Sequence, residues 1–264
     1  MDLGLRHEIQ ERNLRKLAAC KAFQFSETFF PYTSGQIGNY YVNSENVMRD
    51  GIGFHTAIID MAIIAGEIEE ENKIDFGFIS GGETRDWIFS YPLAYRMCRP
   101  HFSVYKDGKV LGADIKGKRG IHVADLNNEG SSPRDLWMPA IRKAGGEVRQ
   151  ILFYVDRLED GVEAMKELGL ESHAAVPMDA HAWDFLREKG IVTSEIYQAS
   201  MQRLEDRAAW AREMLRSGKG IERLAELARE PKTTDKAKKI LNAGYPDMKD
   251  EMLERLGAKG ISLA

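Results

Sequence analysis

The stretch that decides the fold is Gly120-Ile-His-Val-Ala-Asp125-Leu-Asn-Asn-Glu-Gly130-Ser-Ser-Pro-Arg-Asp135. An apolar run ends in an acid, a small polar loop follows, and a helix is expected to begin after the loop. Ser132 suits the capping position of that helix, Pro133 its first position and Asp135 its third. Because the free N–H groups of a helix start favour an anion, the stretch predicts an anion site at the end of a strand.

The loop has residues that fit a sugar phosphate. Gly130 has no side chain to keep a phosphate from the backbone, and Ser131 and Ser132 can donate hydroxyl hydrogen bonds. Asp125 stands at the strand end, where parallel sheets bind ligands, and can accept hydrogen bonds from sugar hydroxyls. The alternative interpretation is an ordinary strand-to-helix turn with a capping serine.

Helices and strands alternate around this stretch. Predicted helices cover about 5–22, 53–70, a segment ending near 97, 133–145 and 160–168. Predicted strands cover about 74–79, 101–105, 120–124, 151–155 and 173–176, while 26–47 is expected to form short strands and turns. The alternation predicts an α/β fold with a parallel sheet covered on both faces.

Strand signals vanish beyond about residue 194. Helices are predicted near 195–216, 219–229, 234–242 and 247–256. We therefore expect a main domain over 1–193, including an N-terminal helix and a hood (residues 26–47), and a helical C-terminal appendage over 194–264. Its charge-rich composition favours an accessory bundle or a dimer-forming element over a catalytic role.

Composition narrows the classes of partner and compartment. The 264 residues carry 37 Lys+Arg against 41 Asp+Glu, a formal net charge of -4, which gives no overall reason to expect a nucleic acid or an anionic membrane. No run approaches the roughly twenty apolar residues of a membrane-spanning helix. Two cysteines and a charged N-terminus without a signal-peptide core predict a cytoplasmic protein. The six histidines form no ligand motif, so no metal site of the protein's own is expected.

The decisive stretch resembles the phosphoribosyl pyrophosphate loop of type I phosphoribosyltransferases, and the orotate phosphoribosyltransferases most closely. Asp125 matches the second of two acids, Gly130 the loop glycine, and Ala124 replaces the first acid. The resemblance implies a role for Asp125 at the ribose hydroxyls and in catalysis. It also implies phosphate anchoring by Asn128, Glu129, Gly130, Ser131 and Ser132.

The segment Ile79-Ser-Gly-Gly-Glu-Thr-Arg-Asp86 lies where the family places its pyrophosphate loop. The resemblance implies that Gly81, Gly82 and Thr84 contact substrate and that Arg85 stabilises the departing pyrophosphate. The alternative for Arg85 is an ion pair with Glu83 or Asp86 on a helix surface.

Two further segments fit the family order. Residues 105–118 resemble the mobile loop, in which Lys106 would bind substrate and Lys109 would neutralise the leaving group. The alternative is a solvated hairpin with incidental lysines. Val155-Asp156-Arg157 resembles the pair whose arginine holds the orotate carboxylate, and the alternative is an ion pair between Arg157 and Glu159. In the hood, the resemblance implies that Tyr40 or Tyr41 stacks on the base, and the alternative is packing in the core or in a turn.

The resemblance implies phosphoribosyl transfer from phosphoribosyl pyrophosphate to orotate or a related pyrimidine-like base, with release of pyrophosphate, as in pyrimidine biosynthesis. Mg²⁺ would arrive with the diphosphate substrate, and a homodimer is expected. Because Asp125 would serve without a second acid, the alternative is a non-catalytic regulatory protein that binds phosphoribosyl pyrophosphate or a nucleotide. A third possibility is a hydrolase or transferase acting on another ribose phosphate.

Overall fold

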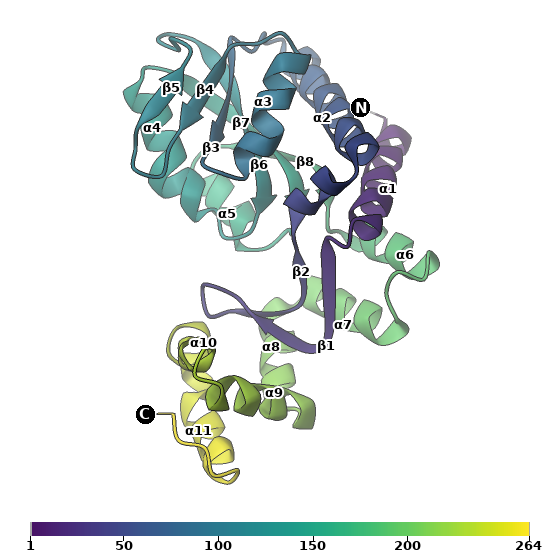
Figure 1. The fold of residues 1–264 in the computed structure, drawn as a ribbon, viewed down its shortest axis with the longest axis vertical. Helices are drawn as coiled ribbons and strands as arrows, with labels where there is room; N and C mark the ends of the chain where they lie inside the picture. Colours follow the sequence, from purple (N-terminus) through teal and green to yellow (C-terminus); the bar gives the residue numbers. More distant parts are fainter. Residues whose placement is uncertain (1, 264) are drawn as a thin grey trace. The chain divides into compact units, whose positions relative to one another are not determined.

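The computed structural model describes residues 2–263, which form two compact units (Figure 1). The first unit contains the residues up to Ala22 together with Asn43–Ala182. The second contains Phe23–Val42 and the chain from Trp183 onward. Each unit therefore consists of two separate stretches of sequence.

The first unit is built on a six-stranded sheet with the order β5-β4-β3-β6-β7-β8. Its strands are β3 (Phe78–Gly82), β4 (His101–Val104), β5 (Val110–Gly112), β6 (Arg119–Asn127), β7 (Glu147–Asp156) and β8 (Glu171–Pro177). All neighbouring pairs are parallel except β4 and β5, which form a hairpin at one edge. The expected α/β fold with a largely parallel sheet is confirmed.

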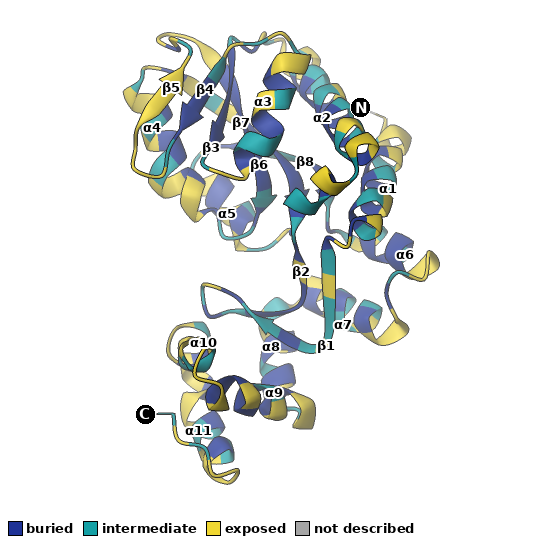
Figure 2. Ribbon diagram, in the orientation of Figure 1, coloured by how far each residue is buried: buried dark blue, intermediate teal, exposed yellow. Residues whose placement is uncertain are grey.

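Helices cover both faces of this sheet (Figure 1). On one face lie α1 (Leu3–Ala19), α2 (Gly51–Asn72) and α3 (Asp86–Arg96). The short helix η1 (Ser44–Arg49) comes directly before α2 in the sequence. On the other lie α4 (Met138–Lys143), which continues the π-helical turn η2 (Pro133–Trp137), and α5 (Asp160–Glu167). The central strands between these layers are buried almost throughout (Figure 2), because a parallel sheet needs both faces covered.

Helix α2 is the most apolar helix of the first unit. At 22 residues it is long and apolar enough to cross a membrane by length and composition alone. However, Ala57, Ile58, Met61 and Ile64 are buried inside the protein. The apolar character of α2 is accounted for by its packing as a core helix.

An apolar cluster holds α4 and α5 against the sheet. It joins Phe78 and Phe153 of the strands to Trp137 and Met138 at the start of the helix that follows β6. Ala124 belongs to the same cluster and is 4% exposed. The position at which the first acid of the phosphate loop is missing is therefore a core position.

The second unit combines a pair of strands with the C-terminal helices. Antiparallel strands β1 (Phe23–Pro31) and β2 (Ile37–Val42) form the pair. The helical elements are α6 (Ala180–Glu188), which begins in the first unit, then α7 (Ser194–Glu205), α8 (Arg207–Arg216), α9 (Gly218–Arg229), α10 (Thr234–Lys239), η3 (Ile240–Gly244), η4 (Pro246–Met248) and α11 (Lys249–Gly257). Phe29 and Ile37 of the strands share one apolar cluster with these helices.

Polar contacts also tie the strand pair to the helices. The Asn39 amide donates to Ser200 Oγ at 2.7 Å, and the Tyr245 hydroxyl donates to Gln36 Oε1 at 2.8 Å. The hood expected over 26–47 thus clusters with the helical unit along most of its length, whereas the sequence had placed it in the domain 1–193. The strands lack a core of their own, so they fold against the helices that bury Phe29 and Ile37.

Most predicted elements are confirmed, with three corrections. Only the end of the apolar run 74–79 is strand: α2 ends at Asn72, residues 74–77 connect it to the sheet, and β3 runs over Phe78–Gly82. The helix expected over 195–216 is broken at Asp206, whose backbone is extended and whose carboxylate caps α8. Strand β5 and helix α6 were not predicted.

Candidate functional site

The candidate site lies at the carboxyl edge of the parallel strands. Asp125 stands near the end of β6, Arg85 directly precedes α3 after β3, and Asp156 ends β7. Parallel strands end at the same edge of a sheet, and this edge is where open α/β sheets bind ligands. The end of β6 and the segment after β3 meet at this edge, where Arg85 makes an ion contact with Asp125.

Asp125 is held by partners from two other segments. Its Oδ2 accepts the Ser44 hydroxyl at 2.8 Å and lies 3.8 Å from Arg85 Nε. Burial raises the pKa of the Asp125 carboxyl, while Arg85 and Ser44 act in the opposite direction. Ser44 was missed by sequence reasoning, because nothing in the sequence indicates that the start of η1 lies beside β6.

Arg85 has ion contacts with Asp125 and Glu45, two acids that the alternative interpretation did not name. Its side chain is 51% exposed, and its guanidinium lies 3.8 Å from both Asp125 and Glu45. The preceding residue, Thr84, is exposed, and the peptide bond between Glu83 and Thr84 is cis. Half of the Arg85 side chain thus faces solvent, and a guanidinium matches the geometry of carboxylates and phosphates.

Gly81 and Gly82 are required by packing. A Cβ atom on Gly81 would lie 2.1 Å from Ser90 Oγ, and one on Gly82 would lie 2.2 Å from the Trp137 ring. Both glycines are buried at the end of β3. These close approaches explain the glycines without a ligand, so contact of Gly81 and Gly82 with pyrophosphate stays a prediction.

The phosphate loop begins its helix earlier than expected. The helix starts at Ser131, and Arg134 N donates to the Gly130 carbonyl at 3.2 Å. Ser132 has helical dihedral angles and makes no side-chain capping bond, so the prediction that it caps the helix is wrong. Gly130 has φ +69°, and a Cβ there would meet Ala164 at 2.6 Å, so this position needs glycine. Ser131 and Ser132 are exposed in the first turn, whose N–H groups have no helical acceptor.

The two residues before Gly130 face inward. Asn128 Oδ1 accepts from Arg157 Nη1 at 3.0 Å, and the Asn128 carbonyl accepts from Gly161 N at 2.9 Å. Glu129 Oε1 is buried and has no hydrogen-bond partner within residues 2–263. The Glu129 carboxylate repels phosphate, and the Asn128 side chain is engaged by Arg157, so these side chains are poorer anion ligands than the two serines.

Arg157 forms the ion pair that the alternative interpretation gave. Arg157 Nη2 lies 2.8 Å from Glu159 Oε1, and their side chains are 3% and 8% exposed. The guanidinium is thus already neutralised and removed from solvent. Its role in holding a base carboxylate stays a prediction, and it requires that the Glu159 pair opens.

Residues 105–112 fold as the hairpin that the alternative interpretation described. Tyr105 N donates to the Lys109 carbonyl at 2.8 Å, and β5 pairs with β4 directly after this turn. Lys109 Nζ lies 3.0 Å from Asp107 Oδ2, with its side chain 78% exposed. Lys106 N donates to Glu83 Oε2 at 2.9 Å, which links the turn to the segment after β3. Part of the segment expected to form the mobile loop is the edge strand β5.

Tyr40 packs inside the second unit. Its ring is 2% exposed and meets Trp183 edge-on at a centroid distance of 5.0 Å. The Tyr40 carbonyl also accepts the Tyr32 hydroxyl at 2.7 Å. The ring is already engaged in packing, so stacking on a base has no support from this geometry.

Two buried groups beside Asp125 were not singled out from the sequence. Asp86, the first residue of α3, accepts backbone hydrogen bonds from Gly82 and Asp125. His122, in β6, contacts Ser80 Oγ through Nδ1 at 2.9 Å. The position of Asp86 at a helix start after a glycine loop was the available signal, but it was interpreted as a surface partner for Arg85.

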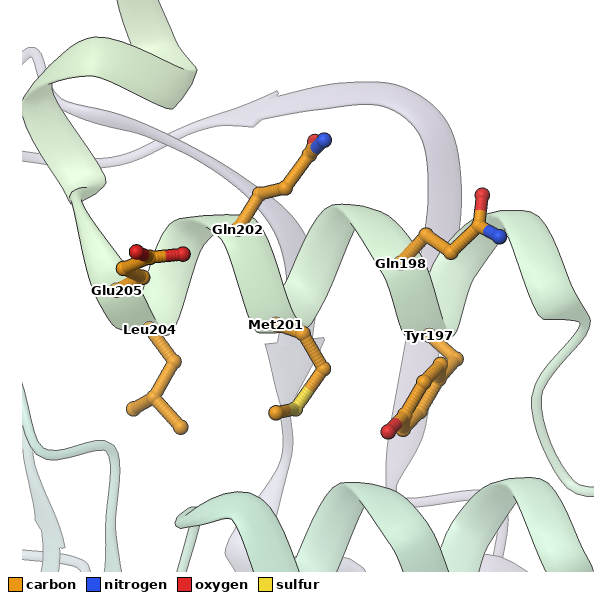
Figure 3. A pocket seen from close by; sticks show the side chains of 6 residues that line it. All are labelled: Tyr197, Gln198, Met201, Gln202, Leu204 and Glu205. Carbon is orange, nitrogen blue, oxygen red and sulfur yellow. The ribbon is translucent and has the colours of Figure 1, made fainter.

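A separate pocket lies along α7 in the second unit (Figure 3). Tyr197, Met201 and Leu204 extend from one side of the helix, and Gln198, Gln202 and Glu205 complete the lining. None of the residues predicted for the phosphate site lines it. Its one-helix lining supplies no cation for a phosphate.

Metal binding by the protein alone finds no support among residues 2–263, where no cluster of three or more His, Cys, Asp or Glu side chains is suitably arranged. A magnesium ion that arrives with a diphosphate keeps several waters and needs few protein ligands. The oxygen ligands at this edge of the sheet, Asp125 and the exposed serines, fit only a magnesium ion that arrives with the diphosphate.

Known proteins resemble this chain in sequence and in fold. No family model matches it. The orotate phosphoribosyltransferase of Pyrobaculum aerophilum is 28% identical over 174 residues, which cover 62% of this chain and 85% of the relative. The orotate phosphoribosyltransferase of Aeropyrum pernix matches in structure with a TM-score of 0.57 at 20% identity, covering 67% of this chain and 99% of that one.

The match extends to part of a larger protein. The UMP synthase of Leishmania donovani gives a TM-score of 0.65 at 18% identity, covering 74% of this chain but 42% of that one. At such identity the structural likeness establishes the fold, and the proteins that match in sequence include adenine as well as orotate phosphoribosyltransferases. The chain therefore has the fold of the type I phosphoribosyltransferases and is, in sequence, a divergent relative of the orotate phosphoribosyltransferases.

Proposed function

We propose that this protein binds phosphoribosyl pyrophosphate and transfers its phosphoribosyl group to orotate or a related base. The observation that carries the proposal is the arrangement at the end of β6. A buried carboxylate, Asp125, lies beside the half-exposed guanidinium of Arg85, and the same strand leads into a glycine turn and a helix start. Sequence similarity to orotate phosphoribosyltransferases adds independent support.

The three parts of the substrate would be divided among three groups. The N–H groups and hydroxyls of Ser131 and Ser132 would bind the 5'-phosphate, as helix starts bind anions. Asp125 would accept hydrogen bonds from the ribose hydroxyls. Arg85 would face the pyrophosphate, and Lys109 would assist after release from Asp107, which holds it at 3.0 Å. A chelated magnesium ion would supply further positive charge to the diphosphate.

The proposed reaction exchanges one bond at the anomeric carbon for another. The bond from that carbon to the pyrophosphate oxygen breaks, and the electron pair leaves with the pyrophosphate. A ring nitrogen of the base forms the new bond, and the proton of that nitrogen passes to solvent. Asp125 stabilises the positive charge that develops on the ribose, while Arg85 stabilises the negative charge on the leaving group.

The base is the least constrained part of the proposal. Arg157 is the residue that would hold an orotate carboxylate, and this residue is buried against Glu159 and Asn128. An anionic base must compete with Glu159 for the guanidinium. This competition favours a base whose carboxylate can take the place of the Glu159 carboxylate. Orotate meets this condition, and adenine, which has no carboxylate, does not.

The second candidate is a protein that binds phosphoribosyl pyrophosphate or a nucleotide without turnover. Specific observations favour it: Ala124 occupies a core position, Lys109 is paired with Asp107, and Arg157 is paired with Glu159. Each of these reduces the charge available for catalysis while leaving the phosphate end of the site intact. Binding and turnover must therefore be measured separately.

The test is a calorimetric titration with phosphoribosyl pyrophosphate and Mg²⁺, followed by an assay of orotate consumption. Replacing Asp125→Asn keeps the acceptor for Ser44 but removes the charge, so affinity should fall roughly 10-fold to 100-fold. Asp114→Asn is the control, because Asp114 is exposed and bonds Lys116 in the loop before β6.

Each outcome decides between the candidates. Binding with orotate turnover supports the transferase, and binding without turnover on any base supports the second candidate. Absence of binding refutes both. Equal affinities of Asp125→Asn and the Asp114→Asn control would remove Asp125 from the site.

A further inference from the structure

A buried polar chain leads from the interior of the sheet to Asp125. Ser80 Oγ contacts His122 Nδ1 at 2.9 Å, and His122 Nε2 faces Asp86 Oδ2 at 3.9 Å. Asp86 Oδ1 in turn accepts the backbone N–H of Asp125 at 3.1 Å. Ser80 and His122 have no solvent exposure. This row of polar groups therefore extends from side chains that are sealed from water to Asp125, the carboxylate that the proposed function assigns to ribose.

Asp86 bridges two strands at the point where the site is formed. Its Oδ2 accepts the N–H of Gly82, at the end of β3, at 3.2 Å, and its Oδ1 accepts the N–H of Asp125 in β6. The residue is 7% exposed. Because buried N–H groups need acceptors, the carboxyl group of Asp86 fixes the backbone that carries Asp125.

The charges around Asp86 favour its protonated form. Burial and the neighbouring Asp125 raise the pKa of Asp86 well above its usual range. The groups that face the pair are His122 from β6, Arg85 from the preceding position, and Glu45 from η1 beside Arg85. Burial lowers the pKa of His122 to about 3, so its ring is neutral and supplies no compensating charge.

His122 gives a second, independent observation. Its Nε2 is buried and has no hydrogen-bond partner within residues 2–263, although it points to Asp86. A hydrogen bond needs a separation of about 3 Å, so a shift of about 1 Å would complete this contact. A ligand that draws Asp125 towards itself can produce such a shift, because Asp86 is bonded to the backbone of Asp125.

We infer that Asp86 is a positioning residue for the ribose-binding carboxylate, a second carboxyl group that holds Asp125 and shares one proton with it. It offsets the loss of an acid at Ala124 with an acid from the start of α3. The inference rests on the proposed function for its ligand, phosphoribosyl pyrophosphate. The shared proton is a property of the protein alone and is measurable without the ligand.

The test combines infrared spectroscopy with calorimetry on the full chain. Ligand-free wild-type protein at neutral pH should show the C=O stretching band of a protonated carboxyl group, and Asp86→Asn should lose intensity there. Calorimetry with Mg²⁺ and phosphoribosyl pyrophosphate, in buffers of different ionisation enthalpy, gives the protons exchanged on binding. The wild type should release a larger fraction of a proton than Asp86→Asn, with affinity roughly tenfold higher.

Controls separate this role from a merely structural one. Asp114→Asn should match the wild type in band, proton count and affinity. The inference is overturned if Asp86→Asn keeps the band intensity or exchanges as many protons as the wild type. If Asp86→Asn does not fold, wild-type protein decides: the band should change with phosphoribosyl pyrophosphate but not with inorganic phosphate, and an unchanged band overturns the inference.

The two proposals fail in different ways. Wild-type protein that does not bind phosphoribosyl pyrophosphate refutes the proposed function and the ligand that the inference assumes. Wild-type protein that binds it but shows no protonated-carboxyl band refutes the inference about Asp86 and leaves the proposed function standing.

Discussion

Replacing Gly82→Ala tests how the segment after β3 is attached to the phosphate-loop helix. The new Cβ would lie 2.2, 2.4 and 2.7 Å from three atoms of the Trp137 ring. Ordinary carbon contacts are about 3.5 to 4.0 Å, so the ring must move by roughly 1 Å or more. Trp137 is 3% exposed and packed in the apolar cluster of that face, so it has little room to move. Overpacking of this kind costs about 1 to 3 kcal/mol.

The assay is thermal and urea-induced unfolding followed by tryptophan fluorescence and circular dichroism. We expect the melting temperature of Gly82→Ala to fall by roughly 2 to 10 °C. Because Trp137 lies in the first turns of the helix after the phosphate loop, affinity for inorganic phosphate should fall as well. The signal tests packing and phosphate binding in one variant.

The control is Gly66→Ala, a substitution of the same kind within α2. A Cβ at Gly66 would have no heavy atom within 4 Å, and alanine favours a helix, so stability should rise by about 0.5 to 1 kcal/mol. If Gly82→Ala were as stable as the wild type while Gly66→Ala behaved as expected, the packing argument for Trp137 would be refuted.

Further predictions concern stability elsewhere in the chain. Asp60 is 1% exposed and accepts hydrogen bonds from Arg12 and Asn13, so Asp60→Ala should lower the free energy of unfolding by about 3 kcal/mol in urea. A decrease below about 1 kcal/mol would contradict this. Burial lowers the pKa of His101 from 6.5 to about 4, so the unfolded chain binds more protons between these values. The free energy of unfolding should therefore decrease as pH falls from 6.5 to 4, and His101→Gln should reduce this slope; an unchanged slope in chemical denaturation would exclude His101 as a cause. Asn39→Ala should leave Ser200 unpaired and cost about 1 to 2 kcal/mol, seen as earlier unfolding of the helical unit; hydrogen exchange that is unaltered there would disagree.

Sequence patterns predicted the centre of the sheet well because its central strands are largely buried. Runs such as Ile151–Val155 are apolar without interruption, and turn residues separate them from the helices. Strand β5 was missed because Val110–Gly112 is short, exposed and enclosed by polar residues. Its strand character comes from pairing with β4, which no local pattern records.

The candidate site was predicted in part for a similar reason. The meeting of Asp125 with Arg85 follows from two parallel strands ending at one edge. The pairs of Arg157 with Glu159 and of Lys109 with Asp107 join near neighbours in sequence, and they were foreseen only as alternatives or not at all. Whether a cation near an acid stays free depends on burial and rotamer, which the sequence does not encode locally.

Asp86 shows the limit of local reasoning most clearly. An acid at the first position of a helix is usually a favourable surface charge, because it complements the helix dipole. Here the same residue is buried and accepts N–H groups from two strands. That role depends on the distance between β3 and β6, so only the folded chain reveals it.

The strand pair of the second unit has a consequence for synthesis and truncation. Phe23–Val42 leaves the ribosome long before Trp183 and the helices that share its apolar cluster. Until those helices appear, Phe29 and Ile37 lack the helical side chains that bury them in the folded protein. A fragment that stops near residue 193 would keep this exposure permanently, so the sheet unit is better isolated by also replacing residues 23–42 with a short polar linker.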